Sequence, residues 1–197
     1  MKNIKVEEVM IPLEEYATVS EEATLYEAVL ALERAQEKYL SDSKPQSYPH
    51  RAILVLGKNN KVVGKISQLD VLKALEPKYH DLITSDTLAR TATSGFSRDF
   101  LKTMLQQFRL FDQPMRDLCK KAAAIKAKDC MYSPKQGGEF VKHEDSLQMA
   151  VHQFVIGQHQ SLLVTKGQSI VGILRLSDVF NAVCQEIKAC DISSSSE

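Results

Sequence analysis

Two short segments place an acid three residues after a polar side chain, where a strand leads into a predicted helix. The first is Ser67-Gln68-Leu69-Asp70, and the second is Arg175-Leu176-Ser177-Asp178. A helix N-terminus presents free backbone amides and a partial positive charge, both of which attract phosphate. A carboxylate is a strong acceptor for paired hydroxyl groups. These two segments are therefore the candidate ligand-binding positions of the chain.

The first segment also suits a plain helix cap, because Ser at the cap and Asp three residues later commonly begin a helix. A short motif of this kind does not by itself separate a cap from a ligand contact. The order of the surrounding elements, which occurs twice in the chain, favours ligand contact at Ser67 and Asp70.

The chain contains a duplicated unit. Ile4–Met10 returns as Ile125–Met131, at an offset of 121 residues at both ends (125 minus 4, and 131 minus 10), and Val63–Val71 returns as Val171–Val179. The best-matched stretches hold a strand, one Gly and an acid that opens a helix. Such a duplication predicts paired binding clefts, and it argues against an enzyme with a single catalytic centre.

Each copy is predicted to fold as a β-α-β-β-α unit. A helix begins at the capping box Thr24-Leu25-Tyr26-Glu27, and the second copy repeats the cap at Ser146 without the Glu. Apolar residues at helical spacing follow both caps. A hairpin comes next, and its return strand leads into a second helix. The expected hairpin strands are 52–56 with 61–66 and 161–164 with 170–174, and the closing helices are 68–75 and 176–187.

A helical insertion separates the two copies. Ser97 is predicted to cap one helix, and a second helix begins at Asp112-Gln113-Pro114 and runs to Ala124. The first helix carries an apolar stripe, for which packing within the protein is favoured over a groove for a partner. The stripe includes Phe100, Met104, Phe108 and Phe111. The chain thus divides into a first unit (1–76), a helical insertion (77–124), a second unit (125–190) and a disordered tail rich in Ser (191–197).

Composition narrows the class of protein. The 197 residues include 25 basic and 25 acidic side chains, and 44% are apolar. The balanced charge argues against binding to nucleic acid or to an anionic membrane. The first ten residues lack the apolar run of a signal peptide, and nowhere do about 18 apolar residues stand together, so we expect a cytoplasmic protein. The four cysteines show neither zinc-site spacing nor the density of a disulfide scaffold, and we expect reduced thiols.

The order of these elements resembles the cystathionine-β-synthase-type (CBS) domain, and two copies in tandem are similar to a Bateman module. The resemblance covers about Ile4 to Leu75 and Ile125 to Ile187. It implies an α/β (α+β) fold, in which two pseudo-symmetric units pack as one module with the helical insertion between them. The resemblance is carried by Val9-Met10, by the capped helix, by His50-Arg51-Ala52-Ile53-Leu54-Val55 and by Gly64-Lys65-Ile66-Ser67-Gln68-Leu69-Asp70.

The resemblance implies an adenosine-containing ligand, such as AMP, ADP, ATP or S-adenosylmethionine, in clefts between the two units. Asp70 and Asp178 would hold ribose hydroxyls, and Ser67 would face phosphate. Met10 and Ile11 suit either the adenine face or the core, and for each His a structural or solvated role is favoured over metal ligation. The further residues placed at the clefts by the resemblance are Met10, Ile11, His50, Arg51, Ala52, Ile66, His159, Gln160, Ser161 and Leu174.

Arg175 departs from the family pattern, because it stands where the first copy has Ser67. An Arg pairs with phosphate oxygens more strongly than a hydroxyl does, or else it is a surface residue on a site that has been lost. The sequence leaves both alternatives open. The two clefts are therefore expected to differ in ligand or in occupancy.

These observations lead to the hypothesis of a regulatory module that senses an adenine nucleotide, as a homodimer, and signals to a partner protein. This role requires no cofactor beyond the regulatory nucleotide. The alternative is a structural dimerisation scaffold without a ligand, which Arg175 and the loop from Ser41 to Pro49 favour. The sequence holds no recognisable nucleophile motif, phosphate-binding loop or dinucleotide fingerprint, so an enzyme is not expected.

Overall fold

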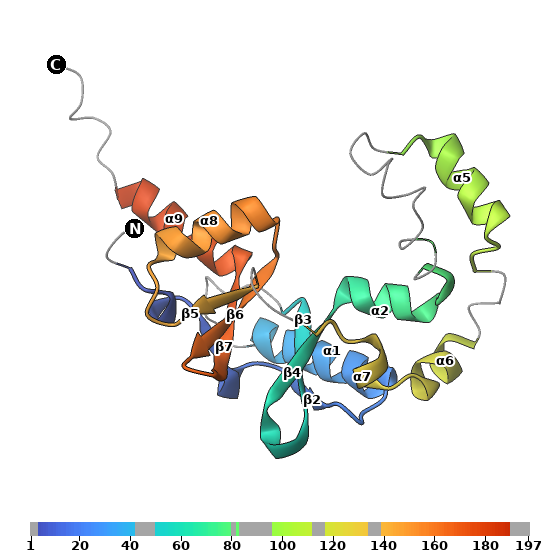
Figure 1. Cartoon of the computed structure of the whole chain (residues 1–197), viewed down its shortest axis with the longest axis horizontal. Helices are drawn as coiled ribbons and strands as arrows, with labels where there is room; N and C mark the ends of the chain where they lie inside the picture. Colours follow the sequence, from blue (N-terminus) through green and yellow to red (C-terminus); the bar gives the residue numbers. More distant parts are fainter. Residues whose placement is uncertain are drawn as a thin grey trace.

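The computed structural model describes residues 4–41, 50–79, 82, 96–111, 117–133 and 139–189. Within these residues the chain forms two small sheets, each packed against the helices of its own copy, and the helices of the insertion lie on the side of the first unit (Figure 1). The mixed α/β fold expected from the duplication is confirmed.

The first unit contains a three-stranded sheet in the order β2-β3-β4. Strand β2 is parallel to β3, whereas β3 and β4 are antiparallel and form the expected hairpin. The central strand β3 is apolar and buried over nearly its whole length, as a strand covered on both faces must be. The elements are β2 (Thr18–Ser20), α1 (Leu25–Ser41), β3 (Ala52–Leu56), β4 (Val62–Ser67) and α2 (Gln68–Leu75).

The second unit repeats this order, and its sheet gains a fourth strand from the start of the chain, in the order β1-β7-β6-β5. Strands β2 and β5 are not located by sequence analysis, because a strand of three residues carries too little periodicity to be recognised. The elements of the second unit are β5 (Phe140–Lys142), α8 (Leu147–Gly157), β6 (Ser161–Lys166), β7 (Ser169–Arg175) and α9 (Leu176–Ala189).

The short lead-in of each copy packs against the other copy. The first lead-in holds η1 (Val6–Glu8), β1 (Ile11–Pro12) and η2 (Leu13–Glu15), and the second holds α7 (Ala127–Cys130). Each lead-in also bonds to the first residue of a helix in the other copy. The amide of Leu147 in α8 donates to the Ile4 carbonyl at 2.8 Å, and the amide of Leu25 in α1 donates to the Ile125 carbonyl at 2.8 Å.

This exchange changes how the chain divides. The boundaries expected from the sequence, 1–76 and 125–190, group each lead-in with the residues that follow it. In the structure, strand β1 pairs antiparallel with β7 of the second sheet, and Tyr132 is bridged to Lys65 of the first sheet. Each structural unit is therefore assembled from two separate stretches of the sequence.

A glycine in each return strand makes room for the exchanged lead-in. A Cβ atom on Gly64 would lie 2.8 Å from the carbonyl oxygen of Tyr132. Tyr132 belongs to the second lead-in, which lies against β4 at this point. On Gly172 a Cβ atom would clash with the carbonyl oxygen of Ile11, where β1 pairs with β7. Glycine within a strand commonly marks such a close approach of another backbone. This approach explains why both return strands carry one.

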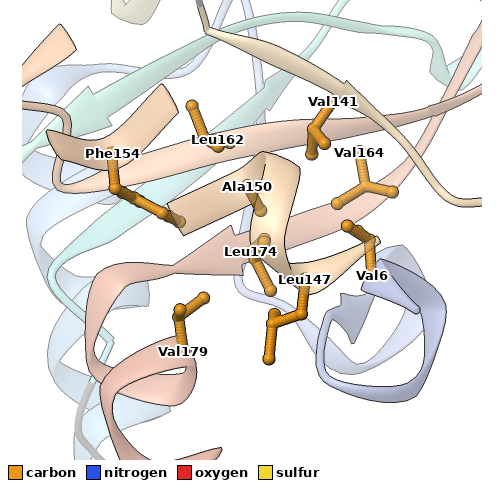
Figure 2. Close-up of a cluster of buried hydrophobic side chains, with 9 residues drawn as sticks. All are labelled: Val6, Val141, Leu147, Ala150, Phe154, Leu162, Val164, Leu174 and Val179. Atoms are coloured by element: carbon orange, nitrogen blue, oxygen red, sulfur yellow. The ribbon is translucent and has the colours of Figure 1, made fainter. Parts of the chain in front are cut away.

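Each lead-in also completes a hydrophobic core. Figure 2 shows Val6 of η1 among the buried side chains of the second unit, which include Leu147 and Val164. Ala127 of α7 occupies the corresponding cluster of the first unit, together with Leu25. Because a third cluster crosses between the units, the two copies form a single module. The buried members of that central cluster are Tyr16, Leu54, Leu163 and Ile173.

The insertion contributes α5 (Arg98–Gln107) and α6 (Leu118–Ala124). Helix α6 ends at Ala124 as predicted, and its Ala122 is buried in the core of the first unit. The start predicted for this helix at Asp112 to Pro114 lies outside the described residues, and so does the predicted tail at 191–197.

Helix α5 begins at its predicted cap, where the Ser97 hydroxyl accepts a hydrogen bond from the Phe100 amide at 3.2 Å. Within the apolar stripe Met104 is buried, whereas Phe108 and Phe111 are exposed. The expectation that the whole stripe packs inside the protein is therefore wrong for these two aromatic side chains. Figure 1 shows the reason, since α5 stands apart from both sheets.

The insertion is tied to the module at the C-terminal end of α2. The amide of Phe111 donates to Oε2 of the buried Glu76 at 2.7 Å, and the Phe111 ring lies edge-on to Tyr79. Lys78 adds a hydrogen bond from its Nζ to the Arg109 carbonyl. The eight-residue helix α2 thus has the candidate segment with Ser67 and Asp70 at its N-terminal end, and Glu76, which binds the insertion, at its C-terminal end.

Because the first lead-in packs on the second unit, a substitution in it is expected to destabilise the second unit rather than the first. Val6→Ala removes buried methyl groups from the core of the second unit, and we expect it to lower the free energy of unfolding by about 2 kcal/mol. In native-state hydrogen exchange the Leu147 amide should lose protection, while the Leu25 amide keeps it. The matched control is Val29→Ala, at an exposed position of α1. Loss of protection at Leu25 rather than Leu147 would contradict the exchange.

Candidate functional site

The first candidate segment lies at the junction of β4 and α2, and it forms a complete capping box. The Ser67 hydroxyl accepts a hydrogen bond from the Asp70 amide at 3.2 Å. Asp70 Oδ2 in turn accepts from the Ser67 amide at 2.9 Å and from the Ser67 hydroxyl at 2.6 Å. Both bonds use Oδ2, so among the described residues Asp70 Oδ1 has no hydrogen-bond partner. Ser67 and Asp70 therefore do cap the helix, and one oxygen of the Asp70 carboxylate bonds to none of the described residues.

The second lead-in passes beside this segment. Lys65 and Tyr132 exchange two backbone hydrogen bonds, at 3.0 Å and 2.8 Å, which hold the lead-in against β4. The thiol of Cys130 lies within the influence of Asp70. Burial, and then the negative charges of Asp70 and Asp129, raise the pKa of Cys130 to about 11. The thiol is therefore protonated at neutral pH, as a structural rather than a reactive cysteine would be.

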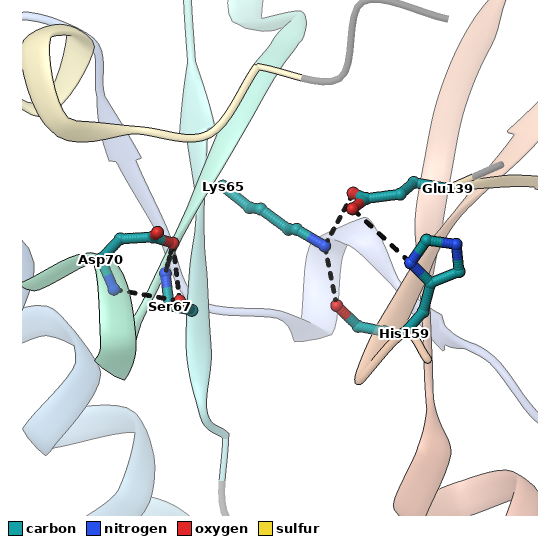
Figure 3. A network of polar contacts seen from close by, with 6 residues as sticks. Lys65, Ser67, Asp70, Glu139 and His159 are labelled. Atoms are coloured by element: carbon teal, nitrogen blue, oxygen red, sulfur yellow. Dashed lines mark hydrogen bonds and ion pairs between the residues drawn. The ribbon is translucent and has the colours of Figure 1, made fainter. Parts of the chain in front are cut away.

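A polar cluster joins the two units on the same side of β4. Side chains alternate along a strand, so Lys65 and Ser67 share one face. Lys65 Nζ lies 3.0 Å from Oε2 of Glu139 (Figure 3). It also donates a hydrogen bond to the Ser161 hydroxyl at 3.3 Å. The side chains of Lys65 and Glu139 are only 12% and 18% exposed, so this ion pair is screened far less than a surface pair.

His159 extends this cluster. Its Nδ1 lies 3.7 Å from Oε1 of Glu139, at the end of the row in Figure 3 that starts at Ser67 and Asp70 and passes through Lys65. His159 and Ser161 belong to the second unit, while Ser67 and Asp70 belong to the first. The structure therefore brings predicted site residues of both copies to one seam, which we call the first seam.

The second candidate segment carries a different arrangement. Arg175 Nε donates to Asp178 Oδ2 at 2.6 Å, and Arg175 Nη2 donates to Asp178 Oδ1 at 2.6 Å. The pair is bidentate, and its side chains are only 8% and 14% exposed. Of the two alternatives open for Arg175, a surface position is therefore wrong, because the side chain is buried against its own acid.

His50 and Tyr16 of the first unit face this pair across what we call the second seam. Their rings meet edge-on with centroids 4.4 Å apart, and His50 is only 5% exposed. Burial, and then the positive charge of Arg175, lower the pKa of His50 to about 4, so the imidazole is neutral at pH 7. Burial likewise raises the pKa of Tyr16, which keeps its phenol protonated.

The backbones of the two seams match even though their side chains do not. The Gln68 amide donates to the Arg51 carbonyl at 3.1 Å, and the Leu176 amide donates to the Gln160 carbonyl at 3.0 Å. Arg51 and Gln160 are exposed, whereas Ala52 and Ser161 are buried at the start of their strands. The duplication therefore preserves a frame that now holds two different sets of polar groups.

Other predicted site residues belong to the cores. Ile66 and Leu174 are fully buried on the opposite face of their strands from Lys65 and Arg175, so only their backbone is left for a ligand. Met10 packs on the core of the second unit. Ile11 packs on the central cluster. Of the two roles considered for Met10 and Ile11, the structure shows core contact.

Sequence reasoning missed two participants at the first seam, namely Lys65 and Glu139. One signal was available, because the aligned copies place Lys65 opposite the apolar Ile173. A charged residue in one copy that aligns with an apolar residue in the other indicates that the two positions make different contacts. Glu139 lies in the divergent stretch before β5, where alignment of the copies gives no guide.

Comparison with known proteins identifies the fold. A sequence model of the CBS domain matches residues 6–77. CBSX2 in complex with AMP is similar over 93% of this chain and 98% of that chain, with a TM-score of 0.56 and 20% identity. The CBS domain of a CBS-domain-containing membrane protein from Sphaerobacter thermophilus is similar over 91% and 87% of the two chains, with a TM-score of 0.55 and 17% identity.

A third similar structure is the CBS domain of a bacterial CNNM/CorC family Mg²⁺ transporter in complex with ATP, at a TM-score of 0.56 and 12% identity over 93% of this chain and 89% of that one. A search of curated protein sequences found no match. Residues 6–77 match the CBS domain, and the chain shares its fold with solved CBS-domain pair proteins.

In the part of the chain that the structure describes, no helix is long and apolar enough to cross a membrane. Within the same residues, no three side chains of His, Cys, Asp or Glu are grouped so that they could hold a metal ion. Cys119, Cys130 and Cys184 are free thiols.

His50 predicts a pH-dependent contribution to stability. Because the pKa falls from 6.5 to about 4 on folding, protonation favours the unfolded chain. The contribution is complete above pH 6.5 and is lost as the pH falls toward 4. Between pH 7.5 and pH 5 we expect a loss of about 2 kcal/mol from this residue. His50→Gln should remove that part of the pH dependence in urea unfolding at the two pH values.

The matched control for this measurement is His152→Gln, because His152 is exposed on α8. The control should keep the pH dependence of the parent protein. An equal pH dependence for His50→Gln and the parent protein would show that His50 is not buried in its neutral form.

Proposed function

We propose that the protein is a regulatory module that binds an adenosine-containing nucleotide at the first seam and signals its bound state to a partner protein. The observation that carries this proposal is the arrangement of Asp70, which lies at the start of α2 and has one carboxylate oxygen that bonds to none of the described residues. Two proteins of similar fold were solved with adenine nucleotides, CBSX2 with AMP and the CNNM/CorC-family CBS domain with ATP. Their ligands support an adenine nucleotide here.

In this proposal each polar group of the first seam has a part to play. Asp70 Oδ1 accepts from ribose hydroxyls, while the Ser67 hydroxyl and the N-terminus of α2 face phosphate. Lys65 lies on the same strand face as Ser67 and is held by Glu139. An incoming phosphate competes with Glu139 for the Lys65 ammonium group. Binding therefore rearranges the ion pair that joins the two units.

Signalling follows from the position of the seam between the units. Ser67 and Asp70 come from one unit, and His159 and Ser161 from the other, so a ligand that contacts both favours one relative arrangement of the units. A partner that distinguishes those arrangements senses the nucleotide without catalysis by the module. The nucleotide is a regulatory ligand in this scheme, and the setting that we propose is the cytoplasm.

Self-association is proposed as part of the same function. The two closing helices, which occupy equivalent positions in the copies, both expose large apolar side chains, and a second copy of the chain offers the same apolar groups in return. The exposed residues are Leu69 and Leu72 on α2 and Leu176, Phe180 and Ile187 on α9.

A ligand-free dimerisation scaffold is the second candidate, and the pairing of Arg175 with Asp178 favours it at the second seam. The two candidates differ in a thermal-shift screen. A nucleotide that binds only the folded protein raises the melting temperature, whereas a scaffold stays dimeric without any response.

Asp70→Ala tests the proposed ribose contact. Because a hydrogen bond to a charged group contributes about 1.5–3 kcal/mol, we expect affinity to fall at least about tenfold in calorimetric titrations with AMP, ADP, ATP and S-adenosylmethionine. The change also removes part of the cap of α2, so Asp70→Asn, which keeps an acceptor for the cap, accompanies it. The control is Asp99→Ala, an exposed acid in the first turn of α5. Unchanged affinity in both Asp70 variants would reject the site.

The dimer surface is tested by charge. Leu72 and Phe180 are 62% and 61% exposed, so Leu72→Glu and Phe180→Glu should leave the fold intact. In analytical ultracentrifugation we expect each to shift the protein from dimer to monomer, because an unpaired charge would be buried in the interface. Leu101→Glu, at an exposed position of α5, is the control. If the two variants remain as dimeric as the parent, association uses another surface.

A further inference from the structure

The two seams have the same backbone frame, but Asp70 and Asp178 differ in how many of their carboxylate oxygens are already bonded to other side chains. Asp70 uses one carboxylate oxygen for the cap of α2. The residue three positions before it is the small Ser67, where the second copy has Arg175. Asp178 has both oxygens bonded to Arg175, at 2.6 Å each. The group that would accept ribose hydroxyls at the second seam is therefore already occupied.

The position of Arg175 makes this occupation durable. A bidentate Arg–carboxylate pair is strong and directional, and at 8% and 14% exposure these side chains are shielded from water. A ligand that took Asp178 would leave the Arg175 charge buried without its carboxylate, which is costly. Phosphate could replace that carboxylate only if the guanidinium turned away from Asp178.

Two described residues of the facing unit, Tyr16 and His50, lie near the pair and carry no charge at pH 7. The rings of Tyr16 and His50 are in edge-on contact with each other. Both residues lie within the influence of Arg175 and Asp178. The Arg175 charge is balanced by Asp178.

We propose that Arg175 closes the second seam to nucleotide by pairing with Asp178, so that each chain binds one nucleotide, at the first seam. This inference rests on the proposed function. It makes Arg175 a residue that sets the number of binding sites, and it makes the two halves of the duplication unequal in their task. The first seam binds the ligand, and the second seam is closed by an ion pair within the second half.

The test is a count of bound AMP and ATP by isothermal titration calorimetry. The parent chain should bind one equivalent, and Arg175→Ser, which copies Ser67, should bind close to two. The matched control is Arg34→Ser, an exposed position on α1, which should bind as the parent does. Two equivalents on the parent chain, or no gain for a folded Arg175→Ser variant, would overturn the proposal.

A second variant guards against loss of fold in Arg175→Ser. Asp70→Ala leaves the second seam untouched, and it should reduce binding at the only open site without uncovering a separate class of tight sites. A full equivalent that binds Asp70→Ala with parental affinity would overturn the proposal. The outcomes also separate the two claims. If neither the parent nor Arg175→Ser binds, both fail; if only Arg175→Ser binds, the closure by Arg175 stands and the proposed function of the native chain fails.

Discussion

The structure depends on the close approach of each lead-in to the return strand of the other copy. Backbone can lie against backbone there only because Gly64 and Gly172 have no side chain. The approach brings Val6 and Ala127 into cores to which they do not belong by sequence position. It also places Tyr132 beside Lys65, so one steric constraint sets both the cores and the surroundings of the first seam.

Local patterns were strong enough to predict most helices and the hairpins. The strand over Ala52–Leu56 and the helix over Gln68–Leu75 begin and end where apolar runs, polar turns and caps indicate. The exchange of lead-ins was not predictable from one sequence, because the repeat is the same whether a lead-in packs on its own copy or on the other. Nor was the partner of Arg175, because that choice depends on burial rather than on spacing.

The unequal seams also explain why the aligned positions of Lys65 and Ile173 differ. Ile173 lies in the central apolar cluster, where it fills space between the units without requiring a partner. Lys65 in the same place requires an acid, and Glu139 of the other unit supplies it. One side of the module is therefore joined mainly by apolar contact and the other by charge.

The interleaving of the two copies has a consequence for biosynthesis. A ribosome releases the chain in order from its N-terminus, so residues 4–79 emerge well before Ala127 and Tyr132. Until those later residues are available, the core around Leu25 and the strand edge at Gly64 stay uncovered. The nascent first half is thus held incomplete until the second half begins. Each half needs the lead-in of the other half to complete its hydrophobic core.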